Sequence, residues 1–144
     1  MLKLLAVIGA GGFGREVAWL IRDINEKEPT WDFVGFIDDR LSGTTVEGYP
    51  IIGNLEVLEK MDPLPYVVCA IGDPVVRKSV VNRCLEAGLE FATLVHPSVL
   101  SSDFVEIGIG SVICAGTILT TNIKVGAYSI LNLNCKVGHD SVLG

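Results

Sequence analysis

The chain has 144 residues, of which 49% are hydrophobic and 19% charged, so it can form one ordinary domain or two small ones and is not a disordered protein. Its 17 acidic and 11 basic residues give a net charge of -6, without the basic surplus that nucleic-acid binding requires, so we expect no nucleic-acid partner. No uncharged apolar run approaches the roughly 18 residues of a transmembrane helix, so we expect no membrane insertion.

The four cysteines are widely spaced and form no CxxC pair. Only two histidines accompany them. This pattern favours reduced, mostly buried thiols in a cytoplasmic protein, and we expect no metal site. The cysteines are Cys69, Cys84, Cys114 and Cys135.

The N-terminal half begins with a short apolar run at residues 3–8 (KLLAVI), typical of a parallel strand buried on both faces. A glycine-rich turn at residues 9–14 (GAGGFG) follows at once, and apolar residues at helical spacing come next: Val17, Leu20, Ile21 and Ile24. A turn between a strand and a helix N-terminus is where backbone N–H groups can bind an anion. The alternative is that the glycines only allow the helix and strand to pack closely.

Two further apolar runs, at residues 33–37 and 66–71, predict two more strands. The second of these is followed by Asp73 and Pro74, which are typical of a helix start, and Gly88 is placed to end that helix. The N-terminal half therefore predicts an α/β unit.

The predicted strands end in the glycine-rich turn, in Asp38-Asp39 and in Gly72. In an open parallel sheet these strand ends face one crevice, which predicts a nucleotide site in a small Rossmann-like parallel sheet over residues 1–95. Gly9, Gly11 and Gly14 also satisfy the GxGxxG pattern of NAD enzymes. Only about four strands fit before residue 95, whereas a dinucleotide fold needs two βαβαβ halves, so a NAD-dependent oxidoreductase is the weaker interpretation.

The C-terminal third is a repeat in which an aliphatic residue returns every six positions. Neither the helical nor the strand period keeps that register, so hexapeptide coils are predicted over residues 96–144, with the aliphatics inward and small residues such as Ser111 and Thr117 at the bends. The pattern still runs at Leu143-Gly144 without a capping coil, so we expect a truncated chain or a last coil covered by another subunit, with truncation favoured. The aliphatics are Ile107, Ile113, Leu119, Val125, Leu131, Val137 and Leu143.

The motifs GAGGFGRE, GFIDD (35–39), GYPIIG (48–53), AIGD (70–73) and VGHD (137–140) occur in this order. In this series the chain resembles the sialic-acid O-acetyltransferase (NeuD-type) family of hexapeptide-repeat sugar acetyltransferases, which includes enzymes that N-acetylate UDP-linked amino sugars. The resemblance covers essentially the whole chain. It implies a left-handed β-helix and a homotrimer.

The resemblance also implies roles for single residues. The general base corresponds to His139, with Asp140 as the neighbouring acid, and Asn132 corresponds to a position near the acceptor group. Phe13 stands where some relatives have histidine, and the acetyl-CoA contacts belong to later coils, beyond Gly144. The nucleotide-sugar contacts correspond to Gly11, Gly12, Phe13, Asp38, Asp39 and Gly72.

His139 follows the inward Val137 by two positions, so we expect it on an outward corner, where it could take a proton from a sugar amine or hydroxyl. His96, which precedes a proline before the repeats, is expected to be structural. We hypothesise an acetyltransferase that uses acetyl-CoA and a nucleotide-activated sugar in surface glycan biosynthesis, without a metal. The alternatives are a non-catalytic nucleotide-sugar-binding or oligomerisation module and, less favoured, the NAD oxidoreductase.

Overall fold

A computed structural model describes residues 1–40 and 43–144, and these form two compact units. The first unit contains Met1–Trp19 and Pro29–Phe91, and the second contains Leu20–Glu28 and Ala92–Gly144. Helix α1 (Gly12–Lys27) therefore contributes residues to both units. None of the helices in the described residues is long and apolar enough to cross a membrane.

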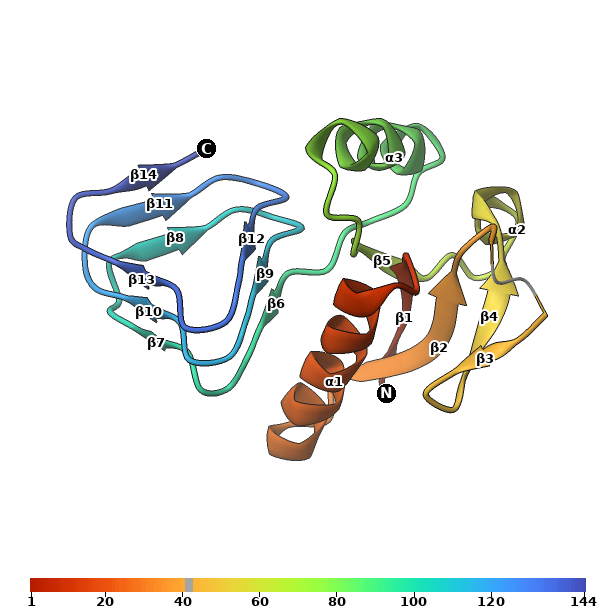
Figure 1. Cartoon of the computed structure of the whole chain (residues 1–144), viewed down its shortest axis with the longest axis horizontal. Coiled ribbons are helices and arrows are strands. Elements are labelled where there is room, and N and C mark those ends of the chain that lie inside the picture. The colour runs from red at the N-terminus through yellow and green to blue at the C-terminus, as the bar shows by residue number, and fades with distance from the viewer. Residues whose placement is uncertain (41–42) are drawn as a thin grey trace. The chain divides into compact units, whose positions relative to one another are not determined.

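The first unit is built on a five-stranded sheet in the order β3-β4-β2-β1-β5 (Figure 1). Strand β1 pairs in parallel with both β2 and β5, and β4 pairs in parallel with β2. Four consecutive residues of β1, Leu5 to Ile8, are buried, as the continuous apolar run predicted. The strands are β1 (Lys3–Ile8), β2 (Trp31–Ile37), β3 (Thr45–Val46), β4 (Tyr49–Gly53) and β5 (Tyr66–Cys69).

The sheet is mixed, and the predicted all-parallel sheet is wrong at its β3 edge. Strand β3 pairs antiparallel with β4. The two residues between them, Glu47 and Gly48, have positive φ angles of 50° and 83°. A two-residue turn of this type folds the chain straight back into a hairpin, which leaves no room for the crossover that a parallel pair needs.

Two further helices complete the first unit, α2 (Leu55–Glu59) and α3 (Pro74–Glu86). The predicted start of α3 is confirmed, because the Asp73 carboxylate accepts hydrogen bonds from the backbone N–H groups of Val75 and Val76 at 2.9 and 3.1 Å. The predicted end is confirmed too, because Gly88 follows the last helical turn with a φ of 81°.

The second unit contains three short parallel sheets, in the orders β6-β9-β12, β7-β10-β13 and β8-β11-β14 (Figure 1). Every third strand pairs, so Ile118 lies between Leu100 and Lys136, each 18 residues away. The chain therefore returns alongside itself after three hexads. The strands are β6 (Leu94–Val95), β7 (Leu100–Ser101), β8 (Val105–Ile107), β9 (Val112–Ile113), β10 (Ile118–Leu119), β11 (Ile123–Val125), β12 (Ile130–Leu131), β13 (Lys136–Val137) and β14 (Val142–Leu143).

The predicted inward aliphatics form the interior of this coil, because all seven belong to one hydrophobic cluster. The bends lie one residue before the predicted positions. They are made by residues with positive φ, whereas Ser111 and Thr117 are fully buried just after them. The Ser111 hydroxyl donates to the Gly126 carbonyl at 2.9 Å, so these small side chains join neighbouring coils instead of forming the bend. The bend residues are Gly110, Gly116, Asn122, Tyr128, Asn134 and Asp140.

Two glycines of the turn after β1 should respond differently to substitution. A Cβ on Gly14 would collide with the carbonyl oxygen of Gly9, whereas a Cβ on Gly11 would meet no atom within 4 Å. Gly14→Ala should therefore lower the free energy of unfolding by about 1–3 kcal/mol, and Gly11→Ala should leave it nearly unchanged. Chemical denaturation measures both, and equal stability of the two variants would contradict this packing.

Candidate active site

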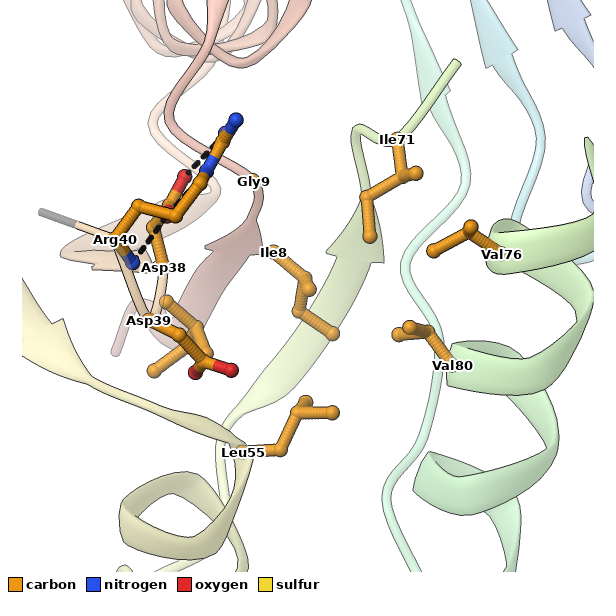
Figure 2. A pocket seen from close by; sticks show the side chains of 10 residues that line it. Ile8, Gly9, Asp38, Asp39, Arg40, Leu55, Ile71, Val76 and Val80 are labelled. Carbon is orange, nitrogen blue, oxygen red and sulfur yellow. Dashed lines mark hydrogen bonds and ion pairs between the residues drawn. The ribbon is translucent and has the colours of Figure 1, made fainter. Parts of the chain in front are cut away.

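A pocket opens at the carboxyl ends of β1, β2 and β5 in the first unit (Figure 2). Its volume is about 390 Å³, within the range of small-molecule sites. Aliphatic side chains from several elements line it, and its polar groups come from the end of β2. The lining residues are Ile8, Gly9, Ile37, Asp38, Asp39, Arg40, Leu55, Ile71, Val76 and Val80.

Asp38 is buried at the rim of this pocket and its carboxylate is fully occupied. It accepts hydrogen bonds from the backbone N–H groups of Ala10 at 3.0 Å and Arg40 at 2.9 Å. It also accepts from Nε and Nη2 of Arg40 at 3.3 and 3.1 Å. The Arg40 guanidinium, helped by these backbone donors, holds the pKa of Asp38 below its ordinary value although burial opposes this.

Asp39 and Arg40 are the exposed polar groups of the pocket. The Arg40 side chain is 77% exposed even though it pairs with a carboxylate that is 5% exposed. Asp39 is also exposed, and its carboxylate makes no hydrogen bond or salt bridge with any residue that the structure describes. Arg40 can thus donate, and Asp39 accept, toward a bound molecule.

The other residues predicted to contact the nucleotide sugar lie outside the pocket lining. Gly11, Gly12 and Phe13 begin α1 or directly precede it, and Gly12 instead borders a surface depression with Arg15. The Gly72 carbonyl accepts a hydrogen bond from Arg77 at 3.3 Å. The structure therefore joins Asp38 directly to Ala10 of the glycine-rich turn, but it does not place every predicted contact around one cavity.

In the second unit, His139 and Asp140 form a hydrogen-bonded pair, with 2.7 Å between Nδ1 and a carboxylate oxygen. Asn122, one coil earlier, donates to the other oxygen of Asp140 at 2.6 Å. This amide first, and His139 second, lower the pKa of Asp140. The ionised carboxylate can accept from Nδ1 only when that nitrogen carries a proton, so in the neutral ring the lone pair that can accept a proton is on Nε2.

The two remaining candidate residues lie elsewhere in the second unit. Asn132 is exposed just after β12, and no hydrogen bond among the described residues joins it to His139. His96, expected to be structural, has a side chain only 10% exposed and bonds Asp23 through Nε2 at 2.7 Å. His139, in contrast, has a side chain 77% exposed.

Several residues of the pocket are not predicted from the sequence. Arg40 follows Asp38 by two positions, and its backbone N–H bonds back to that carboxylate, so an Asx turn was the available signal. Val76 and Val80 stand four residues apart on α3 and so share a face. Leu55 opens α2 after its N-cap Asn54 and carried no signal of its own.

The glycine-rich turn joins a parallel strand to a helix and lies next to a pocket at the carboxyl ends of the strands. This arrangement is typical of α/β units that bind nucleotides. Residues 4–84 match the PglD N-terminal domain, and the chain belongs to this family. This match, together with the relatives described next, supports the resemblance to sugar acetyltransferases. The likeness to sialic-acid O-acetyltransferases in particular stays a prediction.

Individual relatives extend the likeness to the rest of the chain. GDP-perosamine N-acetyltransferase of Escherichia coli O157:H7 is 28% identical over an alignment of 144 positions that covers 99% of this chain and 65% of that protein. The acetyltransferase domain of PglB from Neisseria gonorrhoeae FA1090, in complex with acetyl coenzyme A, is 30% identical with a TM-score of 0.87 over 99% of this chain and 67% of that one. WeeI from Acinetobacter baumannii AYE is 38% identical, with a TM-score of 0.87 over 98% of this chain and 66% of that one.

Asp38→Asn should lower the free energy of unfolding at pH 7 by about 1–3 kcal/mol, because the amide cannot accept all the bonds that the carboxylate accepts. The folded-state pKa of Asp38 lies below its ordinary value of 3.8, so this contribution is complete above that pH and is lost as the pH falls through the folded-state pKa.

The free energies of unfolding of wild type and Asp38→Asn, measured by denaturation at several pH values, should therefore become equal in acid. Asp39→Asn is the matched control and should change stability little, because its carboxylate is exposed and bonds none of the residues that the structure describes. A stability difference for Asp38→Asn that is constant down to the lowest pH would contradict the assignment.

Proposed function

We propose that the protein is a sugar N-acetyltransferase, which moves the acetyl group of acetyl-CoA to an amino group of a nucleotide-activated sugar in surface glycan biosynthesis. The observation that carries the proposal is the pocket at the strand ends in a chain of this family. The named activity of the relative from Escherichia coli and the acetyl coenzyme A bound to the PglB domain support it. The N-acetyltransferase activity named for the relative from Escherichia coli also favours an amino group over a hydroxyl group as the acceptor.

In this proposal the two parts of the chain divide the work. A Rossmann-like domain, residues 1–95, holds the nucleotide sugar, and a left-handed β-helix, residues 96–144, carries the acetyl-transfer site in a cytoplasmic homotrimer. The backbone of the glycine-rich turn faces the phosphates, and Asn132 lies near the acceptor group. The residues proposed to bind the nucleotide sugar are Gly11, Gly12, Phe13, Asp38, Asp39 and Gly72. Asp38 acts indirectly, through its hydrogen bonds to Ala10 and Arg40.

The chemical step assigns the proton to His139. The sugar nitrogen attacks the thioester carbon, Nε2 of His139 takes the proton that the nitrogen loses, and the C–S bond breaks to release CoA. Asp140 holds Nδ1 at 2.7 Å, which fixes the orientation and tautomer of the ring and stabilises its charge after protonation. No step requires a metal.

The test is an assay for CoA thiol release in the natural protein with acetyl-CoA and GDP-, UDP- or dTDP-linked 4-amino sugars. His139→Asn should lower kcat by about 10²- to 10⁴-fold, because it removes the general base. The affinity for the sugar nucleotide should be retained. Lys124→Gln, an exposed position on β11 in the preceding coil, is the control and should keep full activity.

Undiminished turnover of His139→Asn would sink the role assigned to this residue. Binding of a sugar nucleotide without any acetyl-CoA binding or thiol release would instead favour the nucleotide-sugar-binding module. NADH binding would favour the oxidoreductase.

A further inference from the structure

Asp38 and Arg40 form an ion pair at the rim of the pocket, but Asp38 is buried and Arg40 is exposed. Their positions in the sequence do not reveal this difference. The acid that follows the second strand of such a sheet is ordinarily expected to bond the ribose. In this chain the Asp38 carboxylate already accepts four hydrogen bonds, from Ala10 and Arg40. Its side chain is only 5% exposed. It therefore has no accessible oxygen left for a substrate hydroxyl.

The Arg40 guanidinium, in contrast, is held in place but only partly used. Asp38 takes the Nε–H and one Nη2–H. A guanidinium has five N–H donors, so three remain on a side chain that is 77% exposed. In Figure 2 the guanidinium extends past the Asp38 carboxylate toward the side of the pocket where Gly9 lies. Because two bonds fix its plane, little side-chain freedom is lost when a ligand binds.

The unused donors of Arg40 favour an anionic group as the ligand, although the Asp39 carboxylate also lines the pocket. Arg40 is the only basic residue among the described residues that line the cavity. The rest of the lining is aliphatic except for Gly9 and the two aspartates, which suits a flat base better than a second charge. The planar donor fork of arginine matches the oxygens of a phosphate, and a lysine in its place would act only as a point charge.

We propose that Arg40 is a substrate-binding residue that holds the diphosphate of the nucleotide sugar, and that Asp38 is a positioning residue that orients Arg40 and the glycine-rich turn. Asp39 is then the free carboxylate of the site, available to a hydroxyl or an N–H of the nucleoside. This assignment rests on the proposed function, because it takes a nucleotide sugar as the ligand.

The test is calorimetric titration of wild type and variants with GDP and UDP, and with guanosine and uridine as the matching nucleosides. Arg40→Gln should weaken binding of the preferred diphosphate by about 10- to 100-fold, the effect of losing a charged hydrogen-bond donor, and should leave the nucleoside nearly unaffected. Arg40→Lys should lie in between, because it keeps the charge and loses the fork. Lys60→Gln removes an equally exposed cation of the same unit that does not line the pocket, and should change neither affinity.

The positioning role of Asp38 predicts non-additive effects. Asp38→Asn should weaken diphosphate binding in the wild-type background and should cause a smaller loss in the Arg40→Gln background, because the part of its effect that acts through Arg40 is already lost there. A merely structural role would give the same loss in both backgrounds. Thermal denaturation of each variant confirms that a folded protein is being titrated.

Two further results of these titrations distinguish a failure of the role of Arg40 from a failure of the proposed function. Unchanged diphosphate affinity in Arg40→Gln, or equal losses for diphosphate and nucleoside, would overturn the role of Arg40 and leave the acetyltransferase proposal standing. If wild type binds neither diphosphate nor their 4-amino-sugar derivatives, the proposed function itself fails.

Discussion

The buried carboxylate of Asp38 is the interaction on which the candidate nucleotide site depends. It bonds Ala10 in the turn after β1 and Arg40 beyond the end of β2, so one side chain connects two strand ends and orients the cation beside them. A buried charge is costly unless it is paired and hydrogen-bonded, and here both conditions are met. The pKa of Asp38 is lowered for the same reason, because Arg40 and the backbone donors stabilise the ionised carboxylate.

The second unit depends on a different constraint, the six-residue register. Aliphatic side chains fill the coil interior, and residues with positive φ turn the chain at regular intervals. The turn residues Asn122 and Asp140 lie 18 residues apart and bond each other, so stacking of the coils also positions the partner of His139. Packing and the candidate catalytic pair therefore arise from one repeat.

The sequence predicted what periodicity and local chemistry determine. The hexad register identified the inward aliphatics because no other regular structure keeps that period, and the cap at Asp73 identified the start of α3. Strand β3 escaped prediction because two residues carry no periodic signal, and its antiparallel pairing comes from the turn at Glu47 and Gly48. The aliphatic lining of the pocket could not be predicted, because Leu55, Val76 and Val80 come together only through tertiary packing.

Asp38 and Asp39 also differ in a way that the sequence could not predict. The sequence placed both aspartates beside the crevice, but it could not tell the saturated carboxylate from the free one. That distinction depends on Arg40 folding back onto Asp38, a contact between side chains that composition and spacing do not encode. Adjacent acidic residues of one motif therefore have different surroundings in this structure, one buried and bonded and the other exposed.

A crystal structure of the protein with GDP or UDP, whichever binds more tightly, is the best single test of the roles of Asp38 and Arg40. We expect the base between the aliphatic walls of the pocket, phosphate oxygens on the guanidinium of Arg40, and Asp38 still bonded to Ala10 and Arg40. A nucleotide bound away from this pocket, or a ribose hydroxyl bonded to Asp38 with Arg40 turned away, would contradict it.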